Sequence, residues 1–184
     1  MGVIDRLLEE PWLHIEGISG TSAGAMNAAV MASGLERGGV PGAKSALEAF
    51  WKAVSDAARF SPLQRSPMAF LSGRWTLEHS PAYIATEWMT RTFSPYALNP
   101  LNAHPLRGIL ADTVDFAALA RSHVKLFVTA TNVRTGTGRV FRNNEISPEV
   151  LLASACLPTM FQAVEIDGEH YWDGGYVGIR APMA

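Results

Sequence analysis

Apolar residues recur at helical spacing in three segments near the start of the chain. The first predicts a short helix that ends at Glu10-Pro11, with apolar positions Val3, Ile4, Leu7 and Leu8. Residues 23–34 are mostly small and apolar, which predicts a buried helix with Gly34 as its C-cap. Residues 43–58 carry an amphipathic stripe made of Leu47, Phe50, Trp51 and Val54. We expect these three helices, with a short strand at Leu13-His14-Ile15 after the first.

The last third of the chain alternates strands with short helices. Residues 124–131 are almost all β-branched or apolar, which predicts a fully buried strand of a parallel sheet, preceded by a helix over 115–122. A hairpin partner is expected at 140–142. Ser147 as N-cap and Pro148 at the first helical position open a helix that should end near Leu157.

A second hairpin is predicted around Asp167-Gly168, a dipeptide that is typical of two-residue turns. Its strands cover 164–166 and 169–172, and the second strand runs directly into Asp173. The alternation of helices and strands, without an internal repeat or a linker, favours one α/β domain over residues 1–184.

The middle of the chain is apolar but irregular. Between residues 59 and 81, prolines and a glycine interrupt the apolar positions. A segment of this kind either acts as a lid or binding loop or covers the core, and the pattern favours both equally. A helix over 83–93 and an extended loop over 94–105 complete this part.

Composition narrows the classes of function. The 184-residue chain has a net charge of −2, and its 15 lysines and arginines are scattered, so nothing favours binding to nucleic acid. The single cysteine, Cys156, excludes an internal disulfide and a cysteine-based metal cluster, and is typical of a reducing compartment. We expect a cytoplasmic protein without a metal site.

The strongest chemical signal is Gly20-Thr21-Ser22-Ala23-Gly24, a G-x-S-x-G pentapeptide. It has the form of a nucleophile elbow, a sharp strand-to-helix turn that exposes a serine hydroxyl. Glycine at the flanking positions avoids a Cβ clash, and the helix that follows points its free amides at the serine. Because the pentapeptide also occurs by chance in glycine-containing loops, a partner residue must decide its meaning.

A serine needs a base before it can act as a nucleophile, usually a histidine oriented by a carboxylate. The order Ser, Asp, His of α/β-hydrolases is not met, because no histidine follows Asp173; the five are His14, His79, His104, His123 and His170. Asp173, followed by Gly174 and Gly175, can be the base if its carboxylate is partly desolvated and within reach. Two alternatives stay open: Asp173 binds its own backbone in a turn, or a serine esterase uses His170.

Together, the elbow and Asp173-Gly174-Gly175 resemble the patatin-like phospholipase family. Further stretches that resemble the family are 129–132, followed by Thr135-Gly136, and 153–158, followed by Phe161. The resemblance therefore spans nearly the whole chain. The resemblance implies a three-layer α/β/α domain around a mainly parallel sheet. It also implies acyl-ester hydrolysis by a Ser-Asp dyad without a cofactor: Ser22 would form an acyl-enzyme, while Asp173 takes the serine proton and later activates water.

The chain departs from the family's pattern near both ends. The family has a glycine-rich G-G-G-x-[RK]-G loop ahead of the elbow, whose amides hold the oxyanion, and this motif does not occur here. The Ala23 amide would be the main donor left. The chain also stops soon after Asp173-Gly174-Gly175. We expect a partial domain, incomplete at both ends, from a longer protein; a naturally shortened and catalytically weak form is the alternative.

The leading functional prediction is therefore a lipid acyl hydrolase of the phospholipase A or esterase type. It would act on phospholipid or other acyl esters at a membrane or micelle surface, which apolar loops such as 60–75 would contact. The alternative is a catalytically weak or inactive fragment of the same fold with a lipid-binding or regulatory role.

Overall fold

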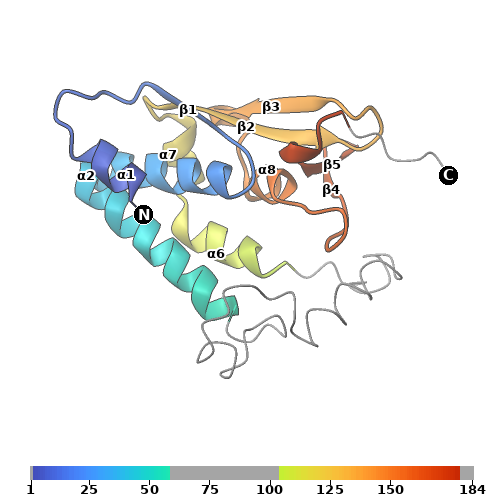
Figure 1. The fold of residues 1–184 in the computed structure, drawn as a ribbon, viewed down its shortest axis with the longest axis horizontal. Helices are drawn as coiled ribbons and strands as arrows, with labels where there is room; N and C mark the ends of the chain where they lie inside the picture. The colour runs from blue at the N-terminus through green and yellow to red at the C-terminus, as the bar shows by residue number, and fades with distance from the viewer. Residues whose placement is uncertain (1, 59–103, 179–184) are drawn as a thin grey trace, which may run out of the picture.

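The computed structural model describes residues 2–58 and 104–178, which form one mixed sheet and the helices packed against it (Figure 1). Predictions for the irregular segment, the helix over 83–93 and most of the loop over 94–105 lie outside the described residues. Two short 3₁₀ turns follow β3 and β5, at Asn143–Glu145 and Gly174–Tyr176. The main elements in chain order are α1 (Val3–Leu8), β1 (Gly17–Gly20), α2 (Ala23–Ala58), α6 (Pro105–Thr113), α7 (Phe116–Ala120), β2 (Lys125–Asn132), β3 (Gly138–Arg142), α8 (Pro148–Ser154), β4 (Val164–Ile166) and β5 (Glu169–Asp173).

Strand β2 organises the sheet, because β1, β3 and β5 all pair with it. β1 runs parallel along residues 125–128 of β2, whereas β5 runs antiparallel along 130–132. β3 is antiparallel along 127–131 and so overlaps both of these registers. A strand has two edges, and β3 occupies one of them. Strands β1 and β5 must therefore lie end to end along the other edge of β2.

The predicted α/β class is confirmed, with the sheet mixed around β2. In Figure 1, α2, α6 and α8 lie beneath the sheet. Helices α2 and α8 pack against β2, and α6 packs against these two helices. The largest fully buried side chains come from these layers and include Phe50, Leu47, Leu110, Leu126, Leu151 and Phe141. Within the described residues, none of the helices is long and apolar enough to cross a membrane.

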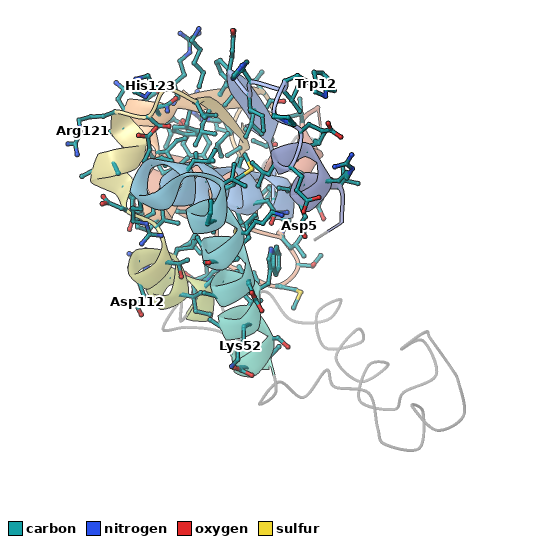
Figure 2. The ribbon with its side chains drawn as sticks, turned by 90° about the vertical axis from the view of Figure 1, so that its left-hand side faces the viewer. Asp5, Trp12, Lys52, Asp112, Arg121 and His123 are labelled. Atoms are coloured by element: carbon teal, nitrogen blue, oxygen red, sulfur yellow. The ribbon has the colours of Figure 1, made fainter. Side chains whose placement is uncertain are left out.

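Helix α2 contains both helices predicted for 23–34 and 43–58, joined across a break at Gly38 and Gly39. Gly34 was predicted as a C-cap, and this is wrong. An added Cβ on Gly34 would come within 2.7 Å of Ala43 Cα and of Gly42 O, so this glycine serves the close approach of the two halves. Figure 2 shows Lys52 near the far end of α2, away from the sheet, with Trp12 and His123 at the opposite end of the molecule.

The strand that enters the elbow is displaced from its predicted position. It covers Gly17–Gly20 rather than Leu13-His14-Ile15, because pairing with β2 fixes it opposite residues 125–128. Helix α6 was not predicted, although Pro105 at its first turn is an ordinary start signal. The hairpin around Asp167-Gly168 is confirmed: both residues have positive φ, 54° and 77°, as a type I′ turn requires. Helix α8 begins as predicted, with the Ser147 hydroxyl accepting from Val150 N, but ends at Ser154.

Candidate active site

Ser22 occupies the sharp turn between β1 and α2. Its φ of 53° lies in the left-handed region, which is uncommon for a residue with a side chain. A conformation of this kind costs of order 1–3 kcal/mol and persists only where the surroundings enforce it. Gly20 permits the tight turn: a Cβ at that position would come within 2.7 Å of Gly24 C and of Ala25 N. The backbone here has the strand-turn-helix form that the sequence predicts, and the role of Ser22 stays a prediction.

Gly24, the second flanking glycine, does not have the predicted steric role. A Cβ built on Gly24 meets nothing within 4 Å, and its φ is not positive. The space beside the first turn of α2 is therefore open, whereas the space at Gly20 is closed.

Hydrogen bonds from distant segments hold the turn in place. The Ser22 amide donates to both the carbonyl oxygen and Oγ of Ser154, each at 3.0 Å. Ser154 Oγ in turn donates to Thr129 O at 2.8 Å, and Thr21 Oγ1 donates to the same carbonyl at 3.2 Å. The elbow is thus fixed to β2 and to the end of α8.

Asp173 is the last residue of β5 and is buried, with 5% of its surface exposed. Its backbone is held on both sides: the amide donates to Cys156 O at 2.9 Å, and the carbonyl accepts from Thr131 Oγ1 at 2.9 Å. Its Oδ1 accepts from Gly175 N at 2.7 Å. The turn interpretation of Asp173 is therefore correct for one carboxylate oxygen.

The sheet register places the end of β5, with Asp173, beside the end of β1, two residues before Ser22. Gly20, at the end of β1, lies opposite Val128, and Asp173, at the end of β5, lies opposite Ala130 on the same edge of β2. Two residues along a strand span roughly 6.6 Å. The turns that follow also touch, because a Cβ on Gly174 would overlap Thr21 Oγ1 and Thr129 O. The glycine after the aspartate is thus needed for close approach to the elbow.

The first amides of α2 point toward this site. Gly24 N and Ala25 N donate to Thr21 O, and Met26 N donates to Ser22 O. Among the described residues, Ala23 N has no backbone acceptor. Together with the positive end of the α2 dipole, this free amide can stabilise a negative charge that develops beside Ser22.

Residues 129–132, at the end of β2, position neighbouring turns. Asn132 Oδ1 accepts from the amides of Arg134 and Thr135, each at 3.0 Å, and its Nδ2 donates to Glu169 Oε2 at 3.0 Å. These bonds fix the loop from β2 to β3 against the start of β5. The similarity at these residues has a structural explanation.

Cys156 lies beside Asp173 but is not suited to nucleophilic chemistry. Burial, with a smaller contribution from the Asp173 charge, raises the pKa of its thiol to about 12. The thiol donates to Gln162 O at 3.1 Å. Because the thiolate is the reactive form, Cys156 is inert at neutral pH.

The described histidines do not support a histidine base. His170 is exposed on β5, and since neighbouring strand residues face opposite sides, it points away from the face that carries Asp173. His14 and His123 are also exposed. His104 stacks on Phe161 at 4.4 Å between ring centroids, and burial lowers its pKa. His79 lies outside the described residues.

An apolar pocket of about 320 Å³ lies between α1, β1 and the first turns of α2. Gly24 lines it, so that its space reaches the first turn after Ser22. Its apolar walls come from Ile4, Leu7, Ile15, Ile18, Ala28 and Met31. A pocket of this size and character suits a small apolar group.

Sequence analysis missed the contribution of Ser154 to the site. The available signal was a polar residue directly after the apolar run 150–153 of α8, where the structure places it fully buried. In residues 2–58 and 104–178, no three or more His, Cys, Asp or Glu side chains form a group that could hold an ion.

The fold and the site define an α/β domain with a strained serine elbow after one strand and a buried aspartate at the end of another. A model of the Patatin-like phospholipase family matches residues 1–181, and the chain belongs to this family. No curated protein matches the chain. Membership of the family implies a lipid acyl hydrolase whose substrates are lipids with acyl esters.

Proposed function

We propose that this chain hydrolyses acyl esters of phospholipids or related lipids with Ser22 as the nucleophile and Asp173 as the base. The observation that carries the proposal is the shared edge of β2, on which β1 ends opposite Val128 and β5 ends opposite Ala130. The left-handed conformation of Ser22 and the burial of Asp173 support the same roles.

In the first half of the reaction, the Asp173 carboxylate takes the proton from Ser22 Oγ as this oxygen attacks the ester carbonyl carbon. The carbonyl oxygen becomes negative and accepts a hydrogen bond from the Ala23 amide. Each donor of this kind contributes about 10²- to 10³-fold in rate. The tetrahedral intermediate then expels the alcohol, which leaves with the proton held by Asp173, and an acyl-enzyme remains on Ser22.

In the second half, Asp173 takes a proton from water, and the hydroxide attacks the acyl carbonyl. The intermediate collapses by breaking its bond to Ser22 Oγ, which recovers the proton from Asp173. The products are a free fatty acid and the original enzyme. The chemistry needs a carboxylate and a serine only, in keeping with the absence of a histidine on the Asp173 face of β5.

The apolar pocket beside α2 is the proposed site of the acyl chain. It begins at Gly24, next to the nucleophile, and extends toward Ile4 and Leu7 of α1. Val3 and Trp12 near this end are 75% and 72% exposed. Exposed apolar and tryptophan side chains favour contact with the interfacial region of a lipid layer. We therefore propose a cytoplasmic protein that meets its substrate at a membrane or micelle surface.

The roles of Ser22 and Asp173 are tested with Ser22→Ala and Asp173→Asn on a chromogenic acyl ester. Each variant should lose at least about 10³-fold in kcat, because residues that act as one unit fail together. Ser19→Ala is the matched control, since Ser19 is exposed on β1 and should leave the rate unchanged.

Two other outcomes would change the assignment. Full activity of Ser22→Ala would refute the nucleophile, and loss of activity in His170→Ala would favour a histidine base. Lipid binding without labelling of Ser22 by a fluorophosphonate would instead indicate the regulatory or lipid-binding alternative.

A further inference from the structure

The segment 154–156 at the end of α8 binds the backbone of both residues of the proposed dyad. Ser154 accepts the Ser22 amide, and Cys156 O accepts the Asp173 amide at 2.9 Å. The two anchored amides are far apart in the sequence, yet both are bound by residues 154–156. Besides their alignment on β2, the backbones at Ser22 and Asp173 therefore share a second anchor in one short segment.

The Ser154 hydroxyl is the only side-chain group in this segment that bonds to the elbow among the described residues. A serine hydroxyl has one donor and two acceptor positions. Its proton goes to Thr129 O at 2.8 Å, and its oxygen faces Ser22 N at 3.0 Å and Thr21 Oγ1 at 3.3 Å. Its proton and one of its acceptor positions are thus used at the elbow, and the residue is fully buried.

The partner carbonyl lies in the gap between the two strand ends. Thr129 falls between Val128, opposite the end of β1, and Ala130, opposite the end of β5. Its carbonyl accepts from the hydroxyls of Ser154 and Thr21, and it also lies against Gly174. The hydroxyl of Ser154 thus joins α8, the gap in the β2 edge and the backbone of the nucleophile.

We propose that Ser154 is a positioning residue that holds Ser22 in its left-handed conformation, and that residues 154–156 act as a clamp that sets its distance from Asp173. This inference rests on the proposed dyad. Ser154 touches neither substrate nor the reacting atoms, because its hydroxyl is buried and bonded to backbone and to Thr21. Its effect passes through the Ser22 amide.

The test replaces Ser154 with Ala, which removes the hydroxyl, and with Cys, which keeps a similar volume but offers only a weak acceptor. We expect kcat to fall about 10- to 100-fold in both variants with KM nearly unchanged, because a small misplacement of a reacting group has effects of this size. Ser33→Ala is the matched control. Ser33 is equally buried and its hydroxyl accepts from Asp115 N at 2.9 Å, away from the elbow.

Amide hydrogen exchange at Ser22 gives a second measurement that does not depend on activity. The wild-type amide should be protected. Ser154→Ala removes one of its two acceptors and leaves the Ser154 carbonyl oxygen at 3.0 Å, so protection at Ser22 should fall in part in this variant and stay unchanged in Ser33→Ala. Unchanged protection and kcat in Ser154→Ala would overturn the proposal, and so would full recovery by Ser154→Cys, which would indicate packing alone. Failure of the proposed dyad gives a different result from failure of the clamp. Without the dyad, wild type and Ser22→Ala would have the same rate, whereas hydrogen exchange at Ser22 would still report on the clamp.

Discussion

The two glycines of the G-x-S-x-G pentapeptide should respond differently to the same mutation. In Gly20→Ala, the new Cβ would meet Gly24 C and Ala25 N, each at 2.7 Å, and Gly24 O at 2.8 Å. Comfortable carbon contacts begin near about 3.5 Å, so these backbone atoms would have to move by roughly 0.8 Å. In Gly24→Ala, the new Cβ meets nothing within 4 Å.

These distances give the expected magnitudes. Overpacking of this kind lowers the free energy of unfolding by about 1–3 kcal/mol, and a displacement near 1 Å lowers kcat by about 10²-fold. Gly20→Ala should show both effects, because the first turn of α2 carries the Ala23 amide and follows Ser22 directly. Gly24→Ala should raise the free energy of unfolding by about 0.5–1 kcal/mol, since alanine is favoured over glycine in a helix.

Urea unfolding and steady-state hydrolysis of a chromogenic ester measure the two effects separately. Gly108→Ala is a matched control for the helical gain, because its Cβ on α6 also meets nothing within 4 Å. Equal losses of activity in Gly20→Ala and Gly24→Ala would refute the steric explanation. Wild-type kcat in Gly20→Ala would refute it as well.

Three further predictions concern the surroundings of the site. If the pocket holds the acyl chain, kcat/KM should rise about fourfold for each methylene added to the acyl chain, because burying one methylene contributes about 0.8 kcal/mol. Ala28→Phe should flatten this rise and leave hydrolysis of the acetyl ester unchanged. The exposed control Ala49→Phe should keep the wild-type dependence on chain length. Cys156, whose burial raises its pKa to about 12, should resist iodoacetamide at pH 8 until the protein unfolds, and rapid alkylation of the native protein would contradict its position. Burial lowers the pKa of His104 in the folded state, so the unfolded chain binds more protons below pH 6.5 and stability should fall as pH drops through that value. In urea unfolding, His104→Phe should weaken this pH dependence, and an equally steep loss in that variant would exclude His104 as its source.

Local signals predicted the parts of the site that depend on a few adjacent residues. The Asp167-Gly168 turn, the Ser147 cap and the strand-turn-helix form around Ser22 each follow from short stretches whose backbone chemistry is specific. For this reason the nucleophile and the aspartate could be chosen from the sequence, whereas their roles stay predictions.

Long-range contacts decided what the sequence could not predict. The entering strand lies at Gly17–Gly20 because it must pair with β2, although Leu13-His14-Ile15 has the stronger apolar pattern. Gly34 looks like the end of a helix, yet its backbone contacts Gly42 and Ala43 across the break in α2. In the same way, no local pattern indicates that Ser154 bonds to a residue in the elbow.

The position of Asp173 depends on the register of β5, which several bonds fix together. A slip of one residue would exchange the two faces of the strand and place Trp172 where Asp173 now lies. The Asp167-Gly168 turn sets the pairing of β4 with β5, Thr131 Oγ1 binds Asp173 O, and Cys156 O binds Asp173 N. Since β1 is aligned on the same edge of β2, these bonds place Asp173 near the elbow. Substitutions that loosen this register should therefore reduce turnover even where they leave the elbow intact.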